Sequence, residues 1–262
     1  MQEQGSGIEK SELNQMSAVK HVIAVMSGKG GVGKSLVTGV LAAMIQKEGY
    51  KVGILDADVT GPSIPRMFGV KERPEQTEFG LIAPPSTIGI RIMSLNLLLE
   101  HEDDPVIWRG PIMANLIKQF WTDVVWGDLD YLLVDLPPGT GDAPLTVMQS
   151  LPLDGVVVVS SPQDLVLMVV GKAVKMARAM SIPILGLVEN MSGVTCPKCG
   201  EFHEVFGPRQ GETAAKEFGV PFLGSIPLDP NLAALCDQGQ VEHYESSVFR
   251  KMAQDIFEAM EP

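Results

Sequence analysis

Short apolar runs rich in β-branched residues alternate with longer segments of helical period along most of the chain. The apolar runs are HVIAVMS from His21, KVGILDAD from Lys51, IGIRIMSL from Ile88, YLLVDLP from Tyr131, GVVVVSSP from Gly155, ILGLVEN from Ile184 and VPFLGSIP from Val220. Helical periodicity predicts helices over residues 36–47, 111–125, 164–180 and 247–260. Strands that are apolar on both faces and alternate with helices form mostly parallel sheets. The pattern therefore predicts a doubly wound α/β fold, with helices on both faces of a mostly parallel sheet.

This pattern places a single domain over residues 20–262. Residues 1–19 are polar and have no sustained apolar period, which is typical of a mobile arm. Downstream, the proline- and glycine-rich stretches are short connectors, and a cysteine-containing insertion is expected near 191–211. The last helical segment has apolar residues at helical spacing, which predicts a packed closing helix. These residues are Phe249, Met252, Ala253, Ile256 and Met260.

The composition of the chain argues against several classes of binding partner. The chain has 20 basic and 32 acidic residues, a formal net charge of −12. Binding to nucleic acid requires clustered Lys and Arg, so no nucleic acid partner is expected. No apolar run approaches the roughly 18 residues that span a bilayer, and the closing segment is too acidic for a membrane-surface helix, so no membrane partner is expected. The polar start MQEQGSGIEK lacks the basic and apolar regions of a signal peptide, which predicts a cytoplasmic protein.

The strongest chemical signal is GKGGVGKS, which follows a predicted strand and precedes a predicted helix. Its residues are Gly28, Lys29, Gly30, Gly31, Val32, Gly33, Lys34 and Ser35. Glycines let backbone N–H groups turn toward phosphate oxygens, and a helix N-terminus favours the same anion. Lys34 is expected to contact the β- and γ-phosphates of ATP, and the Ser35 hydroxyl to ligate Mg²⁺. A purely structural glycine-rich turn is the alternative.

Acidic residues end two of the predicted strands. Asp56 and Asp58 close KVGILDAD, and Asp135 closes YLLVD, at the sheet edge where ligands bind in doubly wound folds. Asp135 resembles the Walker B position that holds Mg²⁺ through water. The following PPGTGD, residues 137–142, suits a switch loop that orders around a triphosphate. Capping of the next turn is the alternative for Asp58 and the preferred interpretation for Asp56.

KGGVGKS resembles the deviant Walker A motif of the MinD, ParA and ArsA class of ATPases. That resemblance implies a nucleotide-sandwich dimer in which Lys29 reaches the phosphates of the partner. It also implies that Asp58 faces the γ-phosphate and activates the attacking water.

Further runs together resemble the Mrp/ApbC family of nucleotide-binding iron–sulfur carrier proteins, from about His21 to the C-terminus. They are DADVTGPSIPRMFG, WRGP, YLLVDLPPGTGD, VENMSG with CPKCG, and GVPFLGSIPLDP. Leu36 replaces a usual threonine beside the phosphates, and GPRQGE replaces a more glycine-rich run. The resemblance implies that Asn190, after the strand ILGLVEN, reads the adenine edge; an asparagine that tolerates a strained turn is the alternative. Arg109 in WRGP has no chemistry assigned.

Three cysteines, an odd number, argue against a disulfide framework. Cys196 and Cys199 have a spacing that lets two thiolates face one metal, and a two-fold dimer would supply four. The family resemblance implies a bridging [4Fe–4S] cluster at these thiolates, and Zn²⁺ in the same seat is the alternative. His203 is near enough for a local zinc knuckle but is interpreted as a solvated loop residue. A thioredoxin-like redox pair is disfavoured, and Cys236 is predicted to be a small buried helix residue.

Motifs and resemblance together predict a homodimeric, slow P-loop ATPase that carries an iron–sulfur cluster between its subunits and transfers it to apo-proteins. Lys29, Lys34 and Asp58 are the expected catalytic residues. Two alternatives remain: a MinD/ParA-like positioning ATPase, and a zinc-stabilised nucleotide-binding protein without cluster transfer.

Overall fold

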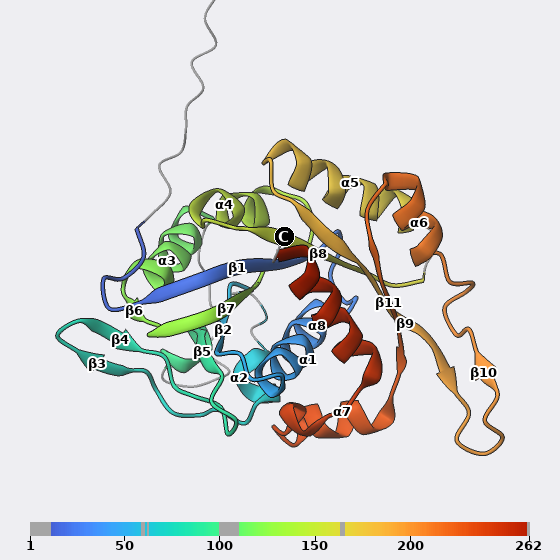
Figure 1. Cartoon of the computed structure of the whole chain (residues 1–262), viewed down its shortest axis with the longest axis horizontal. Helices are drawn as coiled ribbons and strands as arrows, with labels where there is room; N and C mark the ends of the chain where they lie inside the picture. Colours follow the sequence, from blue (N-terminus) through green and yellow to red (C-terminus); the bar gives the residue numbers. More distant parts are fainter. Residues whose placement is uncertain (1–11, 59–60, 62, 100–109, 163–165, 261–262) are drawn as a thin grey trace, which may run out of the picture.

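The computed structural model describes residues 12–58, 61, 63–99, 110–162 and 166–260, and Arg109 lies outside them. Its centre is an eight-stranded sheet in the order β10-β9-β8-β1-β7-β2-β5, with β11 pairing to β9 (Figure 1). These strands are β1 (Ala18–Ser27), β2 (Val52–Asp56), β5 (Arg91–Ser94), β7 (Asp128–Asp135), β8 (Gly155–Ser160), β9 (Ile184–Thr195), β10 (Phe202–His203) and β11 (Phe222–Leu228). All these pairings are parallel except β10 with β9. The predicted doubly wound sheet is confirmed.

Side-chain alternation in the central strands divides the core into two layers. In β1, Ile23 and Val25 point to one face, and Ala24 and Met26 point to the other. The first face is covered by α1 (Lys34–Lys47), α2 (Ile64–Met67), α7 (Pro230–Asp237) and α8 (Ser247–Met260). The second face is covered by α3 (Gly110–Thr122), α4 (Asp142–Ser150), α5 (Val166–Ala179) and α6 (Gly211–Phe218). Both faces of the strands are therefore buried, as their apolar runs predict.

The predicted closing helix is α8, with bounds that match the prediction. Phe249, Met252, Ala253 and Ile256 are buried against α1 and β11, and Met260 is half-buried. Among the helices that the structure describes, none is long and apolar enough to cross a membrane.

A small second sheet, separate from the central one, was not predicted. It consists of β3 (Glu75–Thr77), β4 (Gly80–Ile82) and β6 (Val124–Val125). Two 3₁₀ turns, Leu95–Leu97 and Val241–His243, complete the described elements.

The arm predicted over residues 1–19 overlaps with the folded domain. Residues 1–11 lie outside the described residues, but β1 already begins at Ala18. Asn14 is buried and its amide donates to the carbonyl of Phe79 at 2.9 Å, while Leu13 packs against the core. Polar residues here are thus part of the fold, because they satisfy the backbone of the small sheet.

Strand β9 continues five residues past Asn190, the end of its apolar run. Its extension is held by pairing with β10, where Thr195 opposes Phe202, and with β11, where Val194 opposes Leu228. The expectation that Asn190 follows the strand is therefore wrong: this residue lies within β9.

Candidate functional site

The motif GKGGVGKS forms a loop between β1 and α1, at the carboxyl ends of the parallel strands. Close packing explains two of its glycines. A Cβ at Gly28 would overlap Val169 of α5, and a Cβ at Gly33 would overlap the amide of Asn190. Gly33 also has φ of 82°, in the left-handed region that favours glycine. The loop is therefore fixed by α5 on one side and β9 on the other.

Lys34, the first residue of α1, is buried between two carboxylates. Its Nζ lies 2.8 Å from Oδ1 of Asp135 and 3.5 Å from Oδ2 of Asp58. Burial of the Lys34 ammonium and of the Asp135 carboxylate is tolerated because each lies beside a group of opposite charge. The lysine side chain is thereby held at the mouth of the loop.

Asp135 collects donors from the start of α1. The Ser35 hydroxyl donates to its Oδ2 at 2.5 Å, and the Thr38 hydroxyl donates to its Oδ1 at 2.9 Å. Complete burial raises the pKa of Asp135, although Lys34 and the two hydroxyls oppose that shift. Thr38 was not predicted; it lies one helical turn after Lys34, and no sequence motif marks it.

Asp56 orients the loop that carries Asp58. Residues 56 and 135 are register partners at the ends of β2 and β7. Asp56 accepts hydrogen bonds from the Ser94 hydroxyl at 3.0 Å and from the backbone N–H of Asp58 at 3.2 Å. Burial, followed by repulsion from Asp135, raises the pKa of Asp56 to about 8. Its position supports the preferred sequence interpretation, in which Asp56 caps the turn.

A cavity of about 310 Å³ opens at this loop. It is lined by the predicted nucleotide-binding residues Gly30, Gly31, Val32, Gly33, Lys34, Ser35 and Leu36 and by the predicted catalytic residue Asp58. Ser27, Ser63, Met67 and Pro138 complete the lining. Its size lies within the range of small-molecule sites, and its backbone amides and lysine suit an anion.

Four residues predicted to bind nucleotide do not line the cavity: Gly28, Lys29, Asp135 and Asn190. Lys29 is half-buried, its backbone carbonyl accepts from the Ser27 hydroxyl at 2.9 Å, and its side chain makes no ion pair or hydrogen bond with the described residues. The buried amide of Asn190 donates to the carbonyl of Val32 at 2.9 Å. Asn190 therefore positions the phosphate loop, and its contact with adenine stays a prediction.

The side chains of Ser35 and Asp135 are suited to binding Mg²⁺. The Ser35 hydroxyl and the Asp135 carboxylate meet within hydrogen-bond distance, so two hard oxygen donors already converge beside Lys34. Mg²⁺ prefers such oxygen ligands and keeps several waters, which a single hydroxyl and one carboxylate allow.

The CxxC sequence forms the tip of a hairpin between β9 and β10, which extends away from the sheet (Figure 1). The backbone N–H of Cys196 donates to the carbonyl of Glu201 at 2.8 Å, and that of Gly200 donates to the carbonyl of Cys196 at 2.9 Å. Donation from the N–H groups of Cys199 and Lys198 lowers the pKa of the Cys196 thiol. The turn is therefore shaped to stabilise a thiolate at Cys196.

The cysteines and His203 differ in solvent exposure and in the element on which they lie. Cys199 and His203 are exposed, and Cys196 is half-buried. His203 lies on β10, so its interpretation as a loop residue is wrong. Cys236 is on α7 as predicted, half-buried, and burial raises its pKa to about 11. Of the three cysteines, Cys199 is therefore exposed, whereas Cys196 and Cys236 are both half-buried, and they differ in the direction in which their surroundings shift the thiol pKa.

A family model described as ParA: NUBPL iron-transfer P-loop NTPase matches residues 18–261. The chain belongs to this family. It is 48% identical over 252 residues to the iron–sulfur cluster carrier protein of Methanocaldococcus jannaschii. The matched region covers 94% of this chain and 87% of that relative. The predicted resemblance to the Mrp/ApbC family is confirmed.

Solved structures agree with this membership. The NUBPL-family chain is 46% identical, with a TM-score of 0.80, to a nucleotide-binding protein from Archaeoglobus fulgidus in complex with ADP and with cobalt, covering 88% of this chain and 91% of that one. It matches the cell division ATPase MinD of Pyrococcus furiosus at 21% identity and a TM-score of 0.64, over 91% of this chain and 99% of that one. The MinD match shows a shared fold.

Proposed function

We propose that the protein is an ATP-hydrolysing iron–sulfur cluster carrier that acts as a homodimer in the cytoplasm and transfers its cluster to apo-proteins. The observation that carries the proposal is that one chain combines a phosphate-loop cavity containing Lys34 and Asp58 with an exposed cysteine knuckle. The name of the Methanocaldococcus relative and the ADP and cobalt of the Archaeoglobus protein support this combination.

At the nucleotide site, the N–H groups of the loop and Lys34 bind the β- and γ-phosphates of ATP. Ser35, and Asp135 through water, would hold Mg²⁺, which would supply positive charge to the phosphate oxygens. Asp58 lines the cavity with a side chain 13% exposed, so its carboxylate can orient water toward the γ-phosphate. Lys29 extends toward the phosphates of the partner subunit when two protomers close, and adds positive charge where the transition state gains negative charge.

Hydrolysis reaches the rest of the chain through the segment after β7. Pro138 lines the cavity, and the N–H of Gly139 donates to the carbonyl of Ser27 at 3.0 Å. Helix α4 begins at Asp142 and packs against α3. A rearrangement beside the γ-phosphate is therefore transmitted to α4, as the switch-loop prediction requires.

The proposed cluster-binding site requires two chains. Cys196 and Cys199 supply two thiolates, and a [4Fe–4S] cluster takes four, which a two-fold dimer provides. The lowered pKa of Cys196 favours its thiolate, which is the ligand form. Zn²⁺ at the same four sulfurs is the competing occupant.

A positioning ATPase is less well supported. A membrane-binding tail needs a free apolar face, but Phe249, Met252 and Ile256 of α8 are buried in the core. The net charge of −12 also opposes attraction to DNA.

Anaerobic reconstitution with iron and sulfide tests the proposal. The wild type should take up about four irons per dimer and transfer them to an apo-ferredoxin. Cys196→Ala should lose the cluster, whereas Cys236→Ala, a cysteine outside the hairpin, should keep it. Lys34→Ala should keep the cluster but lose the acceleration of transfer by ATP. Equal cluster content in Cys196→Ala and the wild type, or equal transfer by Lys34→Ala with ATP, would contradict the proposal.

A further inference from the structure

Strand β10 and the residue before it present two potential metal ligands, His203 and Glu201, on one face. Residues 201 and 203 are two apart, so in an extended chain their side chains point to the same side and Phe202 points to the other. The Phe202 ring lies where a Cβ of Gly193 would be, and the Arg209 guanidinium lies 5.4 Å from its centroid. Packing of Phe202 against β9 therefore fixes the face on which Glu201 and His203 lie.

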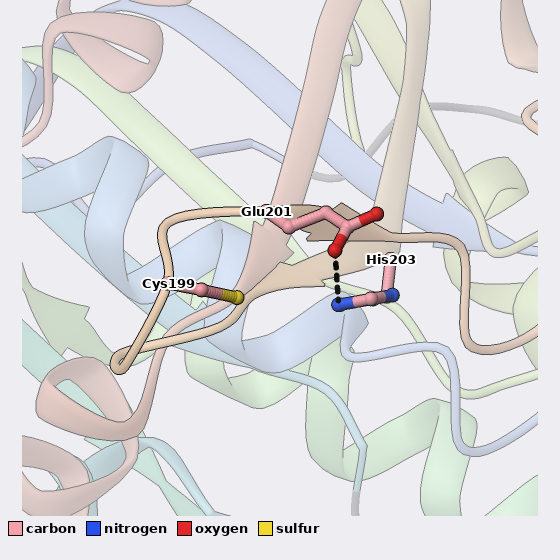
Figure 2. Close-up of side chains that lie close together, drawn as sticks. All are labelled: Cys199, Glu201 and His203. Atoms are coloured by element: carbon pink, nitrogen blue, oxygen red, sulfur yellow. Dashed lines mark ion pairs between the residues drawn. The ribbon is translucent and has the colours of Figure 1, made fainter.

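Cys199 approaches this face from the turn. Its sulfur, a carboxylate oxygen of Glu201 and an imidazole nitrogen of His203 all lie within 4.8 Å of one another. Figure 2 shows the Glu201 and His203 side chains facing each other, with Nε2 of His203 3.9 Å from Oε2 of Glu201. Ligand atoms around one tetrahedral ion are about 3.5 Å apart. All three side chains are exposed, so small rotations about their side-chain bonds close this difference.

We propose that Cys199, Glu201 and His203 form a metal site within a single chain, for a divalent transition-metal ion of the Zn²⁺, Co²⁺ or Fe²⁺ class. One sulfur, one nitrogen and one oxygen donor suit these borderline ions and not Mg²⁺ or Ca²⁺. Three protein ligands leave the fourth position to water. Binding releases the Cys199 thiol proton to solvent and transfers no electron.

This site is distinct from a four-thiolate seat, although the two share Cys199. Cys196 is not a member of the three-residue group. An ion bound by Glu201 and His203 occupies the Cys199 thiolate and so prevents that chain from supplying both sulfurs to a bridging cluster. Where the proposed cluster function holds, one equivalent of Zn²⁺ per chain should therefore block cluster assembly, and His203→Ala should relieve the block.

Anaerobic titration of the full chain with Co²⁺ tests the site independently of cluster transfer. The wild type should bind one Co²⁺ per chain, with a thiolate-to-cobalt charge-transfer band and the d–d bands of four-coordinate cobalt. His203→Ala and Glu201→Gln should each weaken binding about tenfold or more, and Cys199→Ser should lose the charge-transfer band. Cys196→Ser should still bind one Co²⁺ with nearly unchanged affinity.

His243→Ala is the matched control, because His243 is exposed on a different element and should leave cobalt binding unchanged. Loss of cobalt in Cys196→Ser together with unchanged affinity in His203→Ala would overturn the proposal and assign the ion to the cysteine pair. Iron and sulfide content of the same variants reports separately on the cluster seat, since that seat requires Cys196 and not His203.

Discussion

Nζ of Lys34 lies 2.8 Å from Oδ1 of Asp135, so the lysine of the phosphate loop and the acid that ends β7 form a buried ion pair. Asp58 is the second carboxylate beside that lysine, at 3.5 Å. Phosphate oxygens entering the cavity therefore compete with two carboxylates for one positive charge.

Lys34→Met should destabilise the fold by about 3 kcal/mol near neutral pH, because it leaves Asp135 buried without its counter-charge. Burial already raises the pKa of Asp135, and losing Lys34 raises it further. A raised folded-state pKa favours folding at low pH, so the loss should shrink as the pH is lowered. Urea unfolding at several pH values measures it. Lys47→Met, which breaks the exposed pair with Glu245, should cost less than about 1 kcal/mol, and an equal cost in both variants would refute the prediction.

Asp56 and Asp130 should show opposite pH dependences. The pKa of Asp56 is raised to about 8 by burial, so the folded state disfavours its ionised form, and stability is lost as pH rises from about 4 to about 8. The advantage of Asp56→Asn over the wild type should thus grow through that range. Hydrogen bonds from Lys20 and from the backbone N–H of Lys51 lower the pKa of Asp130, so its contribution is lost as pH falls below 3.8. Asp130→Asn should therefore cost most at neutral pH. Parallel slopes in the two variants would rule out these assignments.

Gly33→Ala should weaken nucleotide binding at least about tenfold, because a Cβ there overlaps the amide of Asn190 that holds the loop. Gly49→Ala is the control: Gly49 also has positive φ, at 95°, but open space where the Cβ would lie. It should cost about 1 kcal/mol of stability and leave nucleotide affinity unchanged. Fluorescent nucleotide titration measures both. The double variant Gly33→Ala/Asn190→Ala should be less impaired than the sum of the single variants, and strict additivity would argue against the overlap.

Cys196 and Cys236 should differ in reactivity. Backbone N–H donors lower the pKa of Cys196, whereas burial raises that of Cys236 to about 11. Since the thiolate is the nucleophile, iodoacetamide at pH 8 should modify Cys196 at least about tenfold faster than Cys236. Peptide mass spectrometry over time gives the rates. In urea the difference should vanish; a difference that persists there would locate its cause in the sequence and not in the fold.

The sequence predicted those features that arise from local pattern. The buried parallel strands and the closing helix 247–260 appear as apolar runs and as helical spacing, and the structure reproduces them. The loop at Gly28–Ser35, where the structure has a cavity, could be located because strand, loop and helix are adjacent in sequence.

Features made by long-range pairing could not be predicted in this way. The hydrogen bond between Asn190 and the loop depends on β9 continuing to Thr195, which pairing with β10 and β11 sustains. Asp56 and Asp135 become neighbours only through the strand order. The grouping of Glu201 with Cys199 and His203 needs β10, a strand of two residues with no apolar signal of its own.

In the proposed function, one cluster joins two chains through Cys196 and Cys199 of each. Native mass spectrometry of the anaerobically reconstituted protein measures this stoichiometry. The spectrum should contain a species of two chains with one [4Fe–4S] cluster, and this species should be absent when Cys199→Ser protein is treated in the same way. A single chain that holds the full complement of iron and sulfide, or a dimer that forms equally well without either, would contradict it.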